Sequence, residues 1–106
     1  MRTEVPVPID GDHRSADAVI DTRNFAALVE AETRIDDIQA LERRISLKQR
    51  DLRLVRVILL VADTRHNRDV IRRVPALRER FPVTTRACLS ALARGRDPGG
   101  DALVII

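Results

Sequence analysis

The chain has 106 residues, of which 44% are hydrophobic and 33% are charged. This length and composition predict one domain with one aliphatic core, and they exclude a disordered chain and a two-domain protein. The formal net charge is +3, and Lys48 is the only lysine among nineteen basic residues. Arginine suits phosphate contacts, but a GC-rich genome also supplies it, so the charge permits a nucleic-acid partner without requiring one.

Cysteine usage and hydropathy bear on the compartment. Cys88 is the single cysteine, which excludes an internal disulfide and favours a reducing compartment. No run approaches the roughly 18 apolar residues of a membrane span, and the N-terminus lacks a signal-peptide core. We therefore expect a cytoplasmic protein with no membrane partner.

The first predicted strand covers Glu4 to Pro8, where valine and proline alternate as at a sheet edge. A polar connection over 10–15 follows. The apolar runs Ala16–Ile20 and Phe25–Glu32 then flank turn residues and predict a β-hairpin with a two-residue loop at Arg23-Asn24.

That loop fixes the register of the hairpin. If Thr22 pairs with Phe25, then Asp17 lies opposite Glu30, with Cβ atoms about 5 Å apart. Glu30 and Glu32 share one face because side chains at i and i+2 of a strand point the same way. Three acids on one apolar face repel each other, so this pattern predicts a divalent cation, Mg²⁺, held by hard oxygen ligands. The alternative is a solvated sheet face with ordinary salt bridges to Arg14 or Arg34.

A long helix is predicted from Thr33 or Glu32, either of which can serve as its cap, to about Leu52. The period of 3.6 residues per turn places the residues of this helix on two opposite sides. One side carries Arg34, Ile35, Ile38, Leu41, Ile45, Lys48 and Leu52, and the other carries Gln39, Arg43, Ser46 and Arg50.

The second half of the chain alternates strand and helix. Val55–Ala62 is a nearly continuous apolar run and predicts a central strand buried on both faces. The remaining expected elements are a helix from Arg65 to about Arg80 that is kinked or broken at Pro75, a helix from Thr84 or Thr85 through Arg94, a turn over 95–100, and a last strand from Ala102 to Ile106.

This order predicts an α/β fold with a mixed β-sheet. The short connections of the first half imply an antiparallel β-meander, whereas the long helix before Val55 implies a crossover to a parallel strand. We expect helices on both faces of the sheet.

From Val5 to Ala62 this arrangement resembles the PD-(D/E)XK, or restriction-endonuclease-like, superfamily. Asp17 takes the place of the motif aspartate, Glu30 that of the second acid, and Glu32 that of the lysine. The resemblance implies metal-assisted hydrolysis of DNA phosphodiesters. Asp17, Glu30 and the carbonyl of Ala31 would hold Mg²⁺, and Glu32 would orient the attacking water or accept its proton.

With glutamate in the lysine position, the positive charge must come from elsewhere. Arg34 or Lys48 on the following helix would act as a migrated basic residue, and Gln39 resembles a helix glutamine of some nuclease branches. A leading helix, usual before the first strand of the nuclease fold, is missing from this sequence.

Nearly the whole chain also resembles the C-terminal domain that follows helix-turn-helix domains in bacterial transcription regulators. The segments concerned are 30–39, 63–68, Phe81-Pro82 and Gly95-Arg96. This resemblance implies a non-catalytic effector or dimerisation domain, a homodimer, and a chain that is either a fragment of a longer regulator or a standalone version.

A group of polar residues is predicted where the two parallel strands end. The carboxyl ends of parallel strands meet at one edge of a sheet, where ligands gather. The phosphate-binding candidates at this edge are Arg34, Arg65, His66, Asn67 and Arg68. The alternative is that the four candidates at 65–68 are simply exposed residues in the first turn of the helix that begins at Arg65.

Overall fold

The computed structural model describes residues 2–4 and 15–106, so the strand predicted at 4–8 lies outside them apart from Glu4, as does most of the polar connection. The sheet has the order β1-β2-β3-β4-β5. Its strands are β1 (Arg2–Glu4), β2 (Ser15–Asp21), β3 (Ala26–Glu32), β4 (Arg56–Val61) and β5 (Ala102–Ile105). Strands β1 to β3 pair in antiparallel fashion, and β4 and β5 continue the sheet in parallel. The prediction of a mixed sheet in an α/β fold is confirmed.

The predicted hairpin forms with the predicted register. Thr22 closes the two-residue loop, because its backbone N–H donates to the Phe25 carbonyl over 2.9 Å and its hydroxyl accepts from the N–H of Asn24 and of Phe25, each over 3.1 Å. Asp17 consequently pairs with Glu30. A local turn has placed two acids directly opposite each other on adjacent strands.

Helix α1 covers Ile38–Leu52, so its predicted start at Thr33 or Glu32 is wrong by several residues. Asp37 is the N-cap, and its side chain accepts from the Ala40 N–H over 3.0 Å. Leu41 and Ile45 are buried as predicted, but Leu52 is 51% exposed, so the predicted apolar side ends about one turn before the helix does.

The second half of the chain follows the predicted order. β4 is central, lies parallel to β3 and is largely buried, as the apolar run implied. The predicted break at Pro75 separates α2 (Arg65–Arg73) from α3 (Pro75–Arg80), because proline is tolerated at the start of a helix but not in its interior. Helix α4 (Thr85–Ala93) begins at its N-cap Thr84 and precedes β5.

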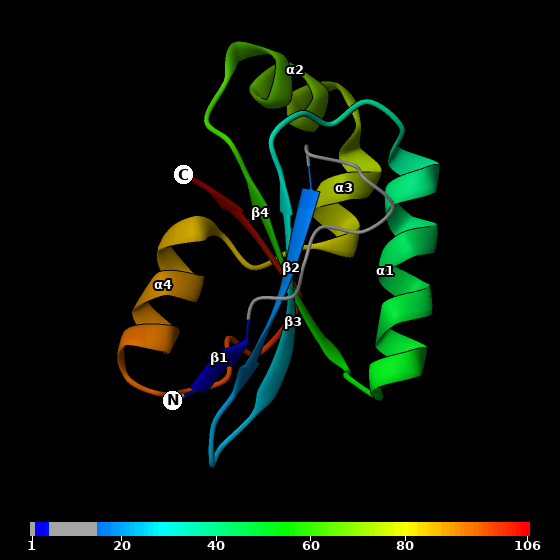
Figure 1. Cartoon of the computed structure of the whole chain (residues 1–106). Coiled ribbons are helices and arrows are strands. Elements are labelled where there is room, and N and C mark those ends of the chain that lie inside the picture. The colour runs from blue at the N-terminus through cyan, green and yellow to red at the C-terminus, as the bar shows by residue number, and fades with distance from the viewer. Residues whose placement is uncertain (1, 5–14) are drawn as a thin grey trace.

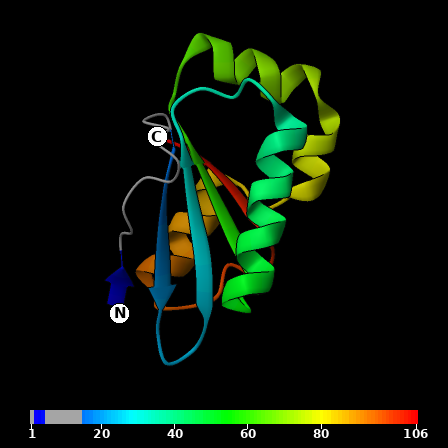
Figure 2. The ribbon, with the colours of Figure 1, turned by 45° about the vertical axis from the view of Figure 1, so that its right-hand side comes forward.

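The helices cover both faces of the sheet, α1 to α3 on one side and α4 on the other (Figure 1; Figure 2 gives a second view). The larger apolar cluster unites alternate residues of the strands, such as Leu28 and Leu59, with Leu41 and Phe81. The smaller cluster, which includes Cys88, lies on the opposite face. Within the described part of the chain, no helix is long and apolar enough to cross a membrane.

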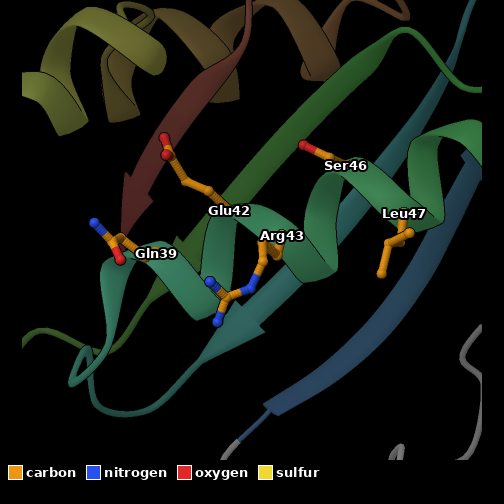
Figure 3. Close-up of a pocket in the computed structure, with 5 residues that line it drawn as sticks. All are labelled: Gln39, Glu42, Arg43, Ser46 and Leu47. Atoms are coloured by element: carbon orange, nitrogen blue, oxygen red, sulfur yellow. The ribbon is translucent and has the colours of Figure 1, made fainter.

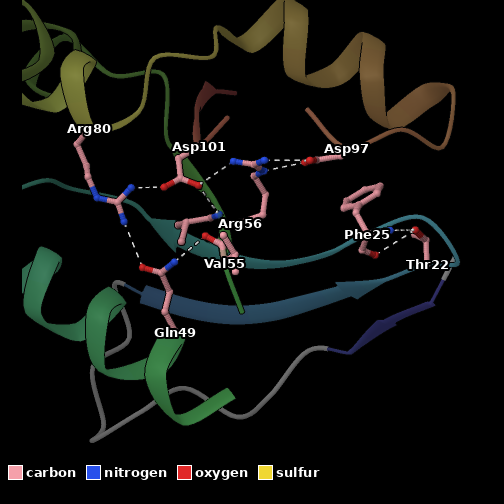
Figure 4. A network of polar contacts seen from close by, with 9 residues as sticks. Thr22, Phe25, Gln49, Val55, Arg56, Arg80, Asp97 and Asp101 are labelled. Atoms are coloured by element: carbon pink, nitrogen blue, oxygen red, sulfur yellow. Dashed lines mark hydrogen bonds and ion pairs between the residues drawn. The ribbon is translucent and has the colours of Figure 1, made fainter. Parts of the chain in front are cut away.

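A polar network fastens the ends at which β4 and β5 begin (Figure 4). Arg56 donates two hydrogen bonds to the Asp97 carboxylate, over 2.7 and 2.9 Å. Asp101 accepts from the backbone N–H of Val57 over 2.9 Å and also contacts the guanidinium of Arg80. These contacts tie the start of β4 to the segment that precedes β5 and to α3.

Candidate acidic site between β3 and α1

Two glutamates of β3 project into the space under α1. Glu30 is fully buried and Glu32 is 8% exposed, and both share the face on which Leu28 joins the larger apolar cluster. In the register of β2 and β3, Asp17 pairs with Glu30. Two of the three predicted acids, Glu30 and Glu32, therefore lie together on a buried sheet face.

Helix α1 supplies two cations to this face. The Lys48 ammonium lies 3.0 Å from Glu30 Oε2. One turn earlier, Arg44 places Nη2 3.3 Å from Glu32 Oε2 and Nε 3.7 Å from Glu30 Oε1. Residues four apart are neighbours on a helix surface, so one side of α1 delivers both charges to β3.

These contacts change the electrostatic argument made from the sequence. Like-charge repulsion alone suggested a metal, whereas Glu30 and Glu32 here contact two cations of α1, Arg44 and Lys48. A buried carboxylate is tolerated when it is paired in this way. Lys48, placed by its sequence pattern on the apolar side of the helix, reaches Glu30 and is only 16% exposed.

Arg44 is the residue that the sequence reasoning missed. Its signal was its spacing, four residues before Lys48 and next to the buried Ile45. The predicted partners were Arg34, which instead pairs with Asp36 over 2.8 Å, and Arg14, which lies outside the described residues.

The donors available for a metal are hard carboxylate oxygens, which suit Mg²⁺. No group of three or more His, Cys, Asp or Glu side chains that could hold a metal occurs among the residues described. Ala31 lies between two paired neighbours, Ala16 in β2 and Leu60 in β4, which puts its carbonyl in the plane of the sheet. Its role as a ligand stays a prediction.

Gln39 is not part of this cluster, so its predicted catalytic place does not fit the structure. It is exposed on the outer side of α1, because a helical period of 3.6 turns it away from Arg44 and Lys48. There it lines a shallow hollow of about 510 Å³ (Figure 3). The other lining residues are Glu42, Arg43, Ser46 and Leu47.

The predicted phosphate-binding residues do gather at one edge, where β3 and β4 end. The Ala62 N–H donates to the Glu32 carbonyl over 3.2 Å, and α2 begins three residues later. Asn67, however, is fully buried. Its Oδ1 accepts from the Ile35 N–H, and its Nδ2 donates to the carbonyls of Thr33 and Ala62, each over 2.9 Å. Asn67 thus ties two strand ends together, and the role of a phosphate ligand does not fit it.

Two of the other candidates at this edge, Arg68 and His66, have protein partners of their own. The Arg68 guanidinium hydrogen bonds to Asp63, which lowers the pKa of that exposed carboxyl. His66 Nε2 lies 2.8 Å from the Ile35 carbonyl. Arg65 is exposed. Arg65 and Arg68 are accessible at this edge, and phosphate binding there stays a prediction.

Comparison with protein-family models, with curated proteins and with solved structures found no match.

Proposed function

We propose that this chain is a restriction-endonuclease-like domain that hydrolyses DNA phosphodiesters with a divalent metal, Mg²⁺ or Mn²⁺, at Asp17, Glu30 and Glu32. One observation carries the proposal. The register pairs Asp17 with Glu30 of β3, the strand that also bears Glu32, and α1 brings the Lys48 ammonium to 3.0 Å from Glu30. The strand order and the crossover helix support it, since both are what the resemblance implied.

Each residue of the site has its own role in this proposal. Asp17 and Glu30 would hold the metal, and Glu32 would accept the proton of the attacking water. When bound, the metal polarises a phosphoryl oxygen and lowers the pKa of the water. Lys48 would supply the positive charge that the glutamate at position 32 cannot, because its ammonium already lies 3.0 Å from Glu30 Oε2.

A second candidate is the non-catalytic effector or dimerisation domain of a helix-turn-helix regulator. What favours it is the burial of the cluster: Glu30 is fully buried, and Lys48 and Arg44 form ion pairs with Glu30 and Glu32. Such a cluster has a structural purpose without any substrate.

DNA cleavage separates the two candidates. The wild type is incubated with plasmid and linear DNA in Mg²⁺ or Mn²⁺, beside Glu30→Gln and the matched control Glu42→Gln on the outer side of α1. We expect the wild type and Glu42→Gln to cleave, and Glu30→Gln to lose cleavage while circular dichroism shows it folded. Absence of cleavage by the wild type with either metal would reject the nuclease and leave the regulatory domain as the better candidate.

A further inference from the structure

A hollow of about 360 Å³ lies at the end of the sheet where β3 and β4 begin, whereas Glu32 lies at the other end of β3. Three segments that are distant in sequence line it: the start of β3, the connection from α1 to β4, and the segment before β5. Sites for small molecules enclose roughly 300–1,000 Å³, so this hollow has room for one small organic molecule.

The apolar part of the lining is held in place by hydrogen bonds. Phe25, Leu54 and Val55 supply it, and Val55 is 82% exposed although a buried strand follows it (Figure 4). Gln49 Nε2 donates to the carbonyls of Leu54 and Val55, over 3.2 and 2.8 Å, which fixes the connection that carries both residues. An apolar group that covered this preformed surface would remove it from water.

Two arginines line the same hollow, and they differ in their partners. Arg56 donates two hydrogen bonds to the Asp97 carboxylate, over 2.7 and 2.9 Å. Arg53 is exposed, and none of the ion pairs in the described part of the chain involves it. The guanidinium of Arg53 is therefore available to an anion from solution, for which its planar fork suits a carboxylate.

The backbone of Arg53 is unusual. Arg53 is the only non-glycine residue with a positive φ among those described, at φ 56° and ψ 42°, and it ends α1. Glycine is favoured in this left-handed conformation, because a Cβ atom is unfavourable there. The helix dipole favours a cation near this end, but Arg50 in the last turn already provides one. Helix stability alone therefore does not account for an arginine at position 53.

We propose that this hollow is a binding site for a small carboxylic acid with an apolar body. The carboxylate pairs with the Arg53 guanidinium, and the body covers Phe25 and Val55. Arg56 is held by Asp97, which leaves Arg53 to make the charged contact. The inference does not depend on the nuclease proposal, because the described lining of the hollow includes none of the acids of the candidate site.

An amide NMR titration tests this with three probes. They are phenylacetate, its neutral analogue phenylacetamide, and acetate, which lacks the apolar body. We expect phenylacetate to shift the amide resonances of residues 25–26 and 53–56. It should bind at least about fivefold more tightly than either of the other probes, a factor that one exposed charged contact supplies.

Variants separate the charged contact from the apolar one. Arg53→Gly removes the charge and suits the left-handed backbone, so it should stay folded, bind phenylacetate at least about fivefold more weakly and bind phenylacetamide nearly as the wild type does. Val55→Ser changes an exposed side chain and should weaken the binding of both ring-bearing probes. The matched control Arg43→Met, on the outer side of α1, should bind all probes as the wild type does. If Arg53→Gly does not fold, Arg53→Asn takes its place, since asparagine also tolerates this backbone.

Two results would overturn the charged contact, and with it the proposal: equal binding of phenylacetate and phenylacetamide by the wild type, or unchanged phenylacetate affinity in Arg53→Gly. A titration to about 10 mM phenylacetate that shifts none of the lining resonances would overturn the site itself. These readouts involve neither metal nor DNA, so they are independent of the cleavage assay.

Discussion

Replacing Asn67 with alanine should be among the most destabilising single changes in this domain. The side-chain amide of Asn67 is fully buried and makes three hydrogen bonds to backbone groups, which belong to Thr33, Ile35 and Ala62. The first two partners follow β3 and the third follows β4. Alanine would leave one N–H and two carbonyls without these contacts.

The expected cost follows from the burial of each partner. A buried polar group that loses its hydrogen bond costs about 1–3 kcal/mol. The bond to the Ile35 N–H is buried and the other two are partly buried, so water can replace part of the loss at the carbonyls. We expect a loss of about 3–5 kcal/mol in the free energy of unfolding, a large share of the roughly 5–15 kcal/mol of a typical domain.

Urea denaturation followed by circular dichroism measures this loss. The matched control is Asn24→Ala, which removes the same amide from an exposed position where it makes one hydrogen bond, of 2.9 Å, to the Gly95 carbonyl. That control should lose less than about 1 kcal/mol. Similar small losses in both variants would refute the reasoning, because they would show that Asn67 does not hold the strand ends together.

Two further predictions concern charged pairs. Lys48→Met should lower the free energy of unfolding by about 3 kcal/mol, because it removes a charge partner of the buried Glu30. The control Arg50→Met breaks the ion pair with Asp51, whose two side chains are 73% and 69% exposed, and should change the free energy of unfolding by less than about 0.5 kcal/mol. Equal effects of the two substitutions in a urea titration would contradict a structural role for the buried pair. Hydrogen bonds from Arg56 lower the pKa of Asp97 below its ordinary value of 3.8, so this pair should stabilise the domain above about pH 4 and lose that effect as the pH falls through the lowered pKa. Asp97→Asn should therefore be less stable than the wild type by up to about 1 kcal/mol at neutral pH and nearly equal to it in acid, and a difference that does not vary with pH would argue against the ion pair.

Much of the fold could be predicted because its signals are local. The loop at Arg23-Asn24 set the hairpin register, and with it the pairing of Asp17 with Glu30. The apolar run that contains β4 predicted a central strand, and Pro75 marked the boundary between α2 and α3. In each case the residues that determine the structure are neighbours in sequence, so backbone sterics and period suffice.

The candidate site depended on contacts between residues distant in sequence. The acids of β3 were visible in the sequence, but which cations meet them depended on how α1 lies over the sheet, and this brought Arg44 to Glu32 and left Gln39 outside. From the sequence, Asn67 was interpreted as a phosphate ligand or an exposed first-turn residue, because nothing near it in sequence shows that two strand ends surround it. Sequence pattern alone determined the strand that carries the carboxylates, whereas only the tertiary structure decided their charge balance, since electrostatic and hydrogen-bond partners are set by distance in space.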